Sequence, residues 1–440
     1  MDDLSVTALS PASENLEAEL AGANRQIGLV RKQCLEMGVR DIASVAAAYH
    51  ELKQQQTASK VWCYDNFTVA GSNSSGIVKS DVHSDERECI VWPINHYLGL
   101  NRHSKVIEAA IEAVREFGTG CGTSAMSGGH NRLHKELEKK LAVWLGKESA
   151  LLFPTGYSAN VGAISGLAKG PSCFVLFDRE CHASIIDGIK LSGAKYLPFR
   201  HNDARDLARK LEKHAAGFEN ILVIVESVYS MSGEEACLQE ICDLKSHHNF
   251  LLFVDEAHSF GLYEERTLCS KLGLSDQVDF VMTTLSKSTA SIGGVVACNH
   301  AFKTMLQVEA NAYLFQAAIP PADAAAILAA MDVIESRPDL LMSLWGKVDY
   351  MRRRLRNLGF DVGNGTSPII PVFVRDSDTL LKLGQDMFEN GIFTTAVAYP
   401  VVKHSEVRFR FILNESHSFE QIDHTIDVLH RLGQSYGLIG

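Results

Sequence analysis

The chain has 440 residues, which suggests two or three domains, or one large α/β domain with an appendage. Apolar residues make up 46% and charged residues 22%, a globular balance that argues against a disordered, collagen-like or disulfide-stapled chain. Lys and Arg number 42 against 53 Asp and Glu, and this net charge of −11 disfavours general binding to a nucleic-acid backbone. We therefore expect no nucleic-acid partner.

The ten cysteines indicate the compartment. No two of them have CxxC spacing and no histidine cluster accompanies them, so we expect reduced core thiols and neither a disulfide framework nor a metal site. The N-terminus from Met1 to Leu4 lacks the charged and apolar regions of a signal peptide. No run of about 18 apolar residues predicts a transmembrane helix. These features predict a cytoplasmic protein.

The N-terminal part predicts amphipathic helices that pack on a larger body, because residues 14–56 are polar with apolar residues at helical spacing. Residues 69–76, rich in Ser, Gly and Asn, predict a loop. The apolar residues at helical spacing are Leu16, Leu20, Ile27, Val30 and Leu35.

A long α/β region runs from about residue 91 to 320. Short apolar runs recur at 150–153, 173–177, 221–226, 251–255, 280–284 and 294–297, with helix-like segments such as 204–214 and 238–247 between them. Buried apolar strands that alternate with helices predict a mostly parallel sheet with helices on both faces.

The remaining residues predict a small α+β domain. Its expected helices are at 340–357, 379–390 and 420–432, and its strands at 369–374 and 407–413. The predicted division is a helical N-terminal extension (1–90), a large α/β domain (91–330) and a small C-terminal domain (331–440).

Asp255 ends one of the apolar runs. Ligands of open α/β sheets bind beyond the carboxyl ends of strands, and an acid after four apolar residues needs a cationic partner. A protonated pyridine nitrogen is one candidate, and a helix N-cap or surface acid is an equally open alternative.

Lys287 lies just past the next run, among small residues. A lysine there is well placed for Schiff-base chemistry if its amine loses its charge in a crowded site. The flanking hydroxyls of Ser286 and Ser288, with backbone amides, could hold a phosphate. A solvated loop lysine is the alternative.

Three other segments carry weaker signals. Residues 153–160 read as a strand end, a glycine turn and a helix start, which is either an anion site or a simple turn. His182, past the run 173–177, either stacks on a flat ring or caps the following helix. The glycine-rich residues 118–123 lack the third glycine of GxGxxG, so a dinucleotide site is not indicated.

Arg408 and Arg410 lie on one face of the strand predicted over 407–413. An arginine there can bind a carboxylate through two hydrogen bonds. A strand face open to solvent is as well supported by the spacing.

The order and spacing of these elements resemble the α-oxoamine synthases, pyridoxal-phosphate (PLP) enzymes of aminotransferase fold type I. The serine palmitoyltransferase branch looks most similar, and the quorum-signal synthases that make amino-ketones are also similar. The resemblance runs from about residue 95 to the C-terminus, and implies an α/β PLP-dependent transferase fold. It includes the segments 95–99 (NHYLG), 200–203 (RHND), 226–233 (ESVYSMSG) and 254–261 (VDEAHSFG).

The resemblance implies catalytic roles. Lys287 matches the lysine that forms the Schiff base with PLP, and Asp255 matches the acid that pairs with the pyridine nitrogen. His182 matches the histidine stacked on the ring, while His258 and Ser230 match residues at its phenolic oxygen.

It also implies binding roles. Gly156 and Tyr157 match backbone donors to the phosphate, and Thr284 matches its hydroxyl donor. Arg410, with Arg408 as the alternative, matches the arginine that takes the amino-acid carboxylate, and we expect Asn95 to contact substrate as well.

Two departures from the family pattern stand out. Before Pro320 and Pro321, relatives carry a Thr or Ser that reaches the phosphate across the dimer interface, whereas this chain reads FQAAI over 315–319. Gln316 is the possible substitute. Ala125 stands where relatives often carry Arg near the substrate entrance, which predicts a different choice of acyl donor.

The activity implied is the decarboxylative condensation of an amino acid with an acyl thioester, carried by coenzyme A or an acyl carrier protein, giving an α-amino ketone, carbon dioxide and a free thiol. We expect a homodimer with its active site at the subunit interface. Another fold-type-I activity, such as an aminotransferase, is the alternative. A non-catalytic regulatory homologue is disfavoured because Lys287 and Asp255 are both present.

None of the ten cysteines falls on a position with an assigned role. Cys181 precedes His182 and is expected to pack behind it. Cys121 lies in the glycine-rich segment and is the thiol that we expect substrate to protect from alkylation.

Overall fold

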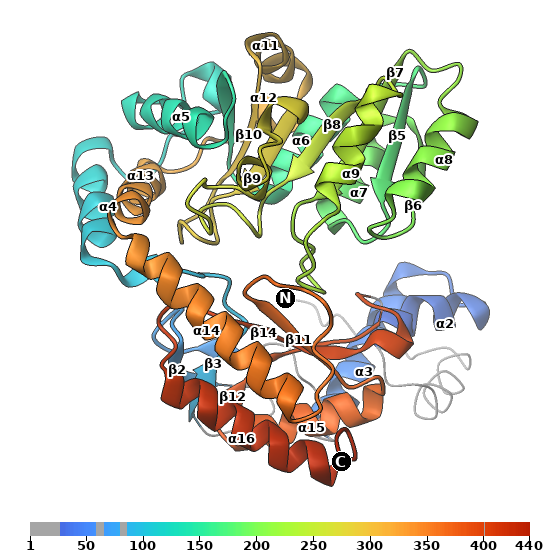
Figure 1. The fold of residues 1–440 in the computed structure, drawn as a ribbon, viewed down its shortest axis with the longest axis vertical. Helices are drawn as coiled ribbons and strands as arrows, with labels where there is room; N and C mark the ends of the chain where they lie inside the picture. The colour runs from blue at the N-terminus through green and yellow to red at the C-terminus, as the bar shows by residue number, and fades with distance from the viewer. Residues whose placement is uncertain (1–26, 59–65, 80–85, 400) are drawn as a thin grey trace, which may run out of the picture.

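The computed structural model describes residues 27–58, 66–79, 86–399 and 401–440. Leu16 and Leu20 of the predicted helices, and Cys63, lie outside the described residues. Figure 1 shows a large domain above a smaller one, with the long helix α14 (Pro338–Asn357) running from the first to the second.

A seven-stranded sheet forms the centre of the large domain. Its neighbouring strands are parallel except around β10, which is antiparallel to both of its neighbours. The predicted mostly parallel sheet is confirmed. The spatial order is β4 (Ser149–Phe153), β10 (Gly294–Cys298), β9 (Phe280–Thr284), β8 (Leu251–Asp255), β7 (Asn220–Glu226), β5 (Cys173–Asp178) and β6 (Lys195–Phe199).

Helices cover both faces of this sheet (Figure 1). Successive side chains of a strand point to opposite faces, so Leu151 and Val175 pack in one core, and Leu152 and Leu176 in the other. The first core is completed by α6 (Gly156–Leu167), α7 (Ala183–Ser192), α11 (His300–Glu309) and α12 (Asn311–Leu314). The second is completed by α5 (Arg132–Trp144), α8 (Ala204–His214), α9 (Leu238–Asp243), α10 (Leu268–Lys271) and α13 (Pro321–Ser336), with α4 (Ser104–Phe117) outside α13.

The small domain contains the predicted mixture of strands and helices. Its three-stranded antiparallel sheet has the order β11 (Ile369–Phe373), β14 (Arg408–Ile412) and β13 (Thr395–Val397). The helices α14, α15 (Ser377–Glu389) and α16 (Phe419–Ser435) lie beside one another in this domain (Figure 1).

The N-terminal part is helical only at first. The helices α2 (Val30–Glu36) and α3 (Ile42–Ala58) pack on each other around a small core of their own. The chain then forms strands, and the end of the predicted loop 69–76 already belongs to one of them. These strands make a second sheet, β1 (Phe67–Thr68), β2 (Ser75–Lys79), β3 (Arg87–Val91) and β12 (Ile392–Phe393).

The parallel pairing of β3 with β12 joins the N-terminal part of the described chain to residues 392–393 of the small domain. It leads us to propose that β1–β3 belong to the small domain, although the division at residues 90 and 330 stays a prediction. In the part of the chain that the structure describes, no helix is both long and apolar enough to cross a membrane.

Candidate active site

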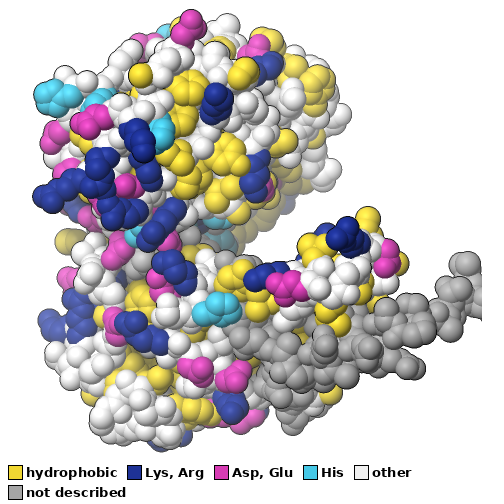
Figure 2. All heavy atoms as spheres, turned by 90° about the vertical axis from the view of Figure 1, so that its right-hand side faces the viewer, with side chains coloured by type: hydrophobic (Ala, Val, Ile, Leu, Met, Phe, Trp, Pro, Cys, Tyr) yellow, Lys and Arg dark blue, Asp and Glu magenta, His cyan; other side chains and the backbone are white. Residues whose placement is uncertain are grey.

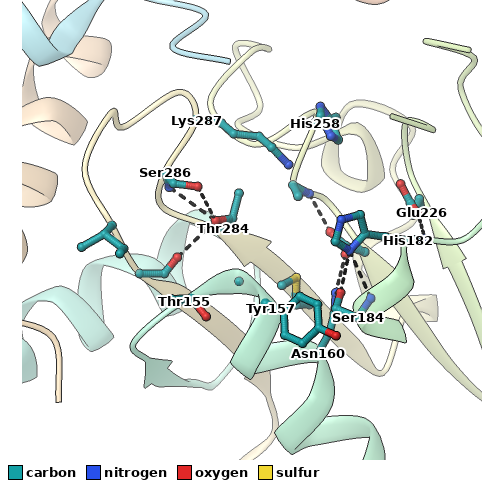
Figure 3. A pocket seen from close by; sticks show the side chains of 16 residues that line it. Thr155, Tyr157, Asn160, His182, Ser184, Glu226, His258, Thr284, Ser286 and Lys287 are labelled. Carbon is teal, nitrogen blue, oxygen red and sulfur yellow. Dashed lines mark hydrogen bonds between the residues drawn. The ribbon is translucent and has the colours of Figure 1, made fainter. Parts of the chain in front are cut away.

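A cavity of about 320 Å³ lies where β8 and β9 end and where α6 and α7 begin (Figure 3). This is the edge at which open α/β sheets bind ligands. All the predicted cofactor residues except Ser230 line it. The lining residues are Thr155, Gly156, Tyr157, Asn160, His182, Ser184, Glu226, Asp255, Ala257, His258, Met282, Thr284, Ser286, Lys287, Ile292 and Gly293.

Lys287 extends into this cavity from the loop after β9 (Figure 3). Burial lowers the pKa of its amine to about 8, although the negative charges of Asp255 and Glu226 act in the opposite direction. The side chain is half-buried in the cavity, so Lys287 is not a fully solvated loop lysine. An amine with this pKa is partly neutral near pH 7 and can act as a nucleophile.

Asp255 ends β8 and is only 4% exposed. One of its carboxylate oxygens accepts a hydrogen bond of 2.9 Å from the backbone N–H of Ala257, and the other accepts one of 2.8 Å from the Asn160 side chain. The carboxylate is thus a buried, oriented group facing a cavity, and the alternative of a surface acid is wrong. Asn160 itself is a residue of the site that the sequence did not single out.

His182 caps the following helix, as one of its two predicted roles requires, whereas stacking on a flat ring stays a prediction. It caps α7, because its Nδ1 accepts hydrogen bonds from the backbone and the hydroxyl of Ser184, at 3.3 and 2.8 Å. With Nδ1 accepting, the ring proton of the neutral form is assigned to Nε2. The ring also lines the cavity, and burial lowers its pKa.

Glu226 is a second buried carboxyl group of the site, 3% exposed at the end of β7. It accepts a hydrogen bond from the backbone N–H of His182, and burial followed by the charge of Asp255 raises its pKa. The signal that points to Asp255, an acid that ends an apolar run, also applies to Glu226.

His258 is held by a residue distant in sequence. The hydroxyl of Tyr97, which is 1% exposed, lies 2.6 Å from its Nδ1. Burial and the nearby charge of Lys287 keep the pKa of His258 well below its usual value, so the ring is neutral. Tyr97 belongs to the motif 95–99 but had no assigned role.

A cradle for an anion lies between α6 and β9. A Cβ added to Gly156 would lie 2.7 Å from Cβ of Thr284, so only glycine lets the helix start this close to the strand end. The hydroxyls of Thr284 and Ser286 lie 2.8 Å apart at this point (Figure 3). Exposed N–H groups at the start of α6 and these hydroxyls suit a phosphate.

The two arginines of β14 differ in their partners. Arg410 donates to the Asn95 side chain at 3.2 Å, while its Nε is buried without a hydrogen-bond partner. Arg408 contacts the Glu406 carbonyl and carboxylate and the Met231 carbonyl, at 2.7, 3.3 and 3.4 Å. Both are buried, so the alternative of a solvent-open strand face is wrong. Of the two, only Arg410 has a buried side-chain nitrogen without a hydrogen-bond partner.

A second cavity of about 540 Å³ adjoins the first, and His182 lines both. It lies between the domains, and Figure 2 shows a hollow between them with Lys and Arg side chains gathered beside it. Ser230 is placed here, away from the first cavity. The lining residues are Arg179, Glu180, Cys181, His182, Ala183, Ile186, Ser230, Met231, Tyr399, Val401, Val402, Lys403 and Glu406.

The two cysteines near the site are placed differently. Cys181 is 6% exposed and its Sγ contacts the Ile224 carbonyl, so it packs beside His182 as expected. The Cys121 thiol lies 3.2 Å from the Ile319 carbonyl and lines neither of these two cavities. Its protection by substrate stays a prediction.

The donor set of the first cavity fits PLP. A buried acid suits a protonated ring nitrogen, the lysine can bind an aldehyde, and the glycine cradle suits a phosphate. The side-chain oxygen of Asn160, which lines this cavity, is buried without a hydrogen-bond partner, which leaves a polar atom for a ligand to satisfy. The predicted substrate residues Arg410, Arg408 and Asn95 line neither of the two cavities.

Known proteins resemble this chain in sequence and in fold. The profile of the family "Aminotransferase class I and II" matches residues 87–429. Serine palmitoyltransferase of Bacteroides thetaiotaomicron is 38% identical over 394 residues, covering 89% of this chain and 98% of that protein. The 8-amino-7-oxononanoate synthase of Thermoanaerobacter pseudethanolicus is 33% identical over 404 residues, covering 91% and 99%.

Solved structures of serine palmitoyltransferase have the same fold as this chain. Serine palmitoyltransferase from S. paucimobilis, with PLP bound, superposes with a TM-score of 0.85 at 28% identity, covering 91% of this chain and all of that one. The enzyme of Sphingomonas wittichii superposes equally well at 29% identity. The chain therefore belongs to the aminotransferase class I and II family and, within it, to the α-oxoamine synthases, the PLP-dependent acyltransferases that condense an amino acid with an acyl thioester and release carbon dioxide.

Proposed function

We propose that this chain condenses serine with a long-chain acyl thioester at the cavity beside Lys287. The observation that carries the reaction class is that the half-buried Lys287 and the buried Asp255 line one cavity, with a glycine cradle beside them. The choice of substrates is supported by the relatives named serine palmitoyltransferase and by the largely apolar second cavity.

The residues that we propose to hold PLP are those of the first cavity. Asp255 would pair with the ring nitrogen and His182 would cover one face of the ring. The N–H groups of Gly156 and Tyr157, with the Thr284 hydroxyl, would hold the phosphate. The Ser286 hydroxyl is a further donor that the structure adds to this set.

The phenolic oxygen of PLP is assigned to His258, whose ring the Tyr97 hydroxyl orients. Ser230 would reach it only from the direction of the second cavity. When bound, PLP supplies an electron sink that stabilises negative charge at the α-carbon of the substrate.

Lys287 performs the proton transfer in this proposal. Its amine lines the cavity together with Asp255, and its lowered pKa suits a group that takes a proton at the α-carbon and returns it. Arg410, held by Asn95, would bind the carboxylate of the amino acid before that carboxylate leaves as carbon dioxide.

The acyl donor is assigned to the second cavity. Its apolar wall of Ile186, Met231, Tyr399 and Val402 suits an acyl chain, and its contact with His182 leads to the first cavity. Arg179 and Lys403 line the same cavity, each paired there with a carboxylate, Glu180 at 3.7 Å and Glu406 at 2.8 Å, and the anionic groups of coenzyme A or an acyl carrier protein would compete for these cations.

We also propose a homodimer. Phe315 is 80% exposed and Met126 is 47% exposed, and the two lie near each other because Ala317 bridges to Ser124. Exposed apolar side chains of this size are typical of an interface, and Gln316, the possible substitute for the cross-subunit Thr, follows Phe315 in the chain. For the location we propose the cytoplasm, which agrees with nine free cysteines among the described residues.

A panel of amino acids and acyl thioesters, with mass detection of products, tests this function. We expect serine with a C16 thioester to give a long-chain amino ketone, carbon dioxide and one equivalent of thiol. A preference for alanine with a dicarboxylic acyl thioester would move the chain to the 8-amino-7-oxononanoate synthase group. An oxo acid without thiol release would make it an aminotransferase and refute the proposal.

A further inference from the structure

His201 lies in the turn after β6 with both ring nitrogens facing carboxylates. Nδ1 lies 3.0 Å from Oδ1 of Asp178, and Nε2 lies 3.2 Å from Oε2 of Glu234. An ionised carboxylate only accepts hydrogen bonds, so each of these contacts requires a proton on the ring nitrogen. The geometry therefore needs the imidazolium form of His201.

Asp178, the first of the two carboxylates that His201 contacts, is held rigidly. Asp178 is fully buried at the end of β5, and its carboxylate also accepts from the Tyr229 hydroxyl and from the backbone N–H groups of Asn202 and Glu180, at 2.9, 2.7 and 2.9 Å. Four donors thus surround one carboxylate, which fixes the anion that His201 contacts.

Glu234, the second carboxylate that His201 contacts, belongs to the turn over residues 229–235. This turn is closed by backbone hydrogen bonds between Tyr229 and both Gly233 and Glu234. It is further tied to the turn of His201 by Asn202, whose side chain donates to the Glu235 carbonyl and accepts from the Cys237 backbone.

The segment held in this way forms part of the second cavity. Ser230 and Met231, at the tip of the turn, line that cavity, and the Met231 carbonyl is the atom that Arg408 contacts from the small domain. A change at His201 is therefore transmitted to the wall of the cavity, although His201 lines neither cavity itself.

We propose that His201 is a positioning residue, whose doubly hydrogen-bonded imidazolium holds the turn 229–235 against the end of β5 and so sets the wall that receives the acyl donor. The assignment of the acyl donor to that wall rests on the proposed function, whereas the charged state of His201 does not.

The surrounding charges favour the cation. Asp178 and Glu180 face His201 from the end of β5, Glu234 and the ring edge of Tyr229 face it from the turn, and Arg408 of β14 acts on Glu234. Burial lowers the pKa of His201, but its hydrogen bonds to Asp178 and Glu234 outweigh this and raise it to about 9. The pKa of His201 in the folded protein lies above the usual 6.5. Its contribution to the free energy of unfolding is therefore complete below pH 6.5 and is lost as the pH rises through about 9.

The charged state is measured on the holoenzyme by NMR of the histidine ring Cε1–H groups, with His201→Gln identifying the signal. We expect a signal, absent from that variant, that titrates with a midpoint near 9. A midpoint at or below 6.5 would show a neutral ring and overturn the inference, whether or not the chain turns over any acyl donor.

The positioning role is measured by steady-state kinetics of His201→Gln, His201→Arg and the control His214→Gln, a substitution at an exposed residue on the neighbouring helix α8. We expect His201→Gln to raise KM for the acyl thioester about tenfold while KM for the amino acid changes less than about twofold. Arginine, a permanent cation with several N–H donors, should restore KM to within about threefold and should keep it constant between pH 8 and 10.

An equal loss in all kinetic constants, or no rescue by arginine, would mean that His201 only stabilises the fold and would refute the positioning role. If His201→Gln does not fold, the comparison of wild type with His201→Arg decides: equal rises in KM from pH 8 to 10 would refute the role. Absence of turnover with every acyl donor in wild type would instead refute the proposed function.

Discussion

At the scale of single residues, the site is defined by one amine between buried acids. Lys287 faces Asp255 and Glu226, and the burial that lowers its pKa also raises that of Glu226. Such opposed shifts in one cavity are typical of sites that move protons. Three predictions test this arrangement and the arginine beside it.

Replacing Lys287 by alanine removes the only amine that lines the first cavity among the described residues. We expect Lys287→Ala to lose the visible absorbance that PLP acquires on binding to a lysine, together with at least about 10³-fold in kcat. Absorbance spectra and product assays check this. A variant that kept both the absorbance and full turnover would refute the assignment of Lys287.

The attachment of PLP to the cofactor-free protein should depend on pH. The neutral amine is the nucleophile, so the rate should rise with pH and level off above the Lys287 pKa of about 8. Stopped-flow absorbance after addition of PLP measures this rate. A profile that is flat from pH 6.5 to 9.5 would show that the charge on Lys287 does not control attachment.

Substitutions of the two arginines of β14 should differ in their effect on KM for the amino acid. Arg410→Lys shortens the group that we assign to the amino-acid carboxylate, so KM for the amino acid should rise about tenfold or more. Arg408→Lys is the matched control, because Arg408 already contacts Glu406 and Met231. If Arg408→Lys raised KM for the amino acid and Arg410→Lys did not, the alternative assignment made from the sequence would be the correct one.

At the scale of elements, the site depends on how closely α6 approaches the sheet. A Cβ at Gly156 would overlap the side chain of Thr284, and a Cβ at Gly294 of β10 would lie 2.3 Å from the Thr155 carbonyl. Helix, strand and phosphate cradle therefore meet only because two glycines face each other.

Gly156→Ala should push α6 away from β9 and weaken the hold on the phosphate. We expect the Kd for PLP to rise about tenfold or more, measured by fluorescence during dialysis. The control is Gly346→Ala in α14, where a Cβ meets nothing within 4 Å. It should leave the Kd unchanged and raise stability by about 0.5–1 kcal/mol, since alanine favours helix. Equal Kd values for the two variants would refute the role of the close approach.

The elements that the sequence predicts best are those buried on both faces. β4, β5 and β9 are buried along their whole length and consist mostly of apolar residues, so hydrophobic patterning identifies them without tertiary information. β6 was missed because it lies at the sheet edge, mostly exposed and with Pro198 inside it. The strands β1, β12 and β13 are too short for any periodicity, and only their pairing defines them.

The residues of the candidate site also fall into those that local sequence predicts and those that only tertiary contacts define. Asp255 and Lys287 follow strand ends, so their placement at the sheet edge follows from local pattern. Tyr97 and Asn160 were missed because their partners, His258 and Asp255, are 161 and 95 residues away in sequence. The position of Ser230 is also set by distant contacts, those of the turn 229–235.

At the scale of the whole molecule, the exposed apolar side chains near Gln316 carry the expectation of a dimer. Phe315→Asp places a charge where we expect the partner subunit, and it should dissociate the dimer and reduce kcat and PLP retention together. Light scattering coupled to gel filtration measures the mass. Leu191→Asp, at a residue 69% exposed on α7, is the control. A dimer of unchanged affinity would place the interface elsewhere.

The pairing of β3 with β12 can form only late in synthesis, after the strands of the large sheet have been made. Ile90 leaves the ribosome about 300 residues before its partner Ile392, and a parallel pairing across such a separation closes late. Until then β3 presents an unpaired edge, the kind of surface that invites intermolecular association. The large sheet is complete once β10 has emerged, so it can fold while the small domain waits for the last fifth of the chain. Truncation before Ile392 should therefore leave a folded large sheet and an unpaired, aggregation-prone edge on β3.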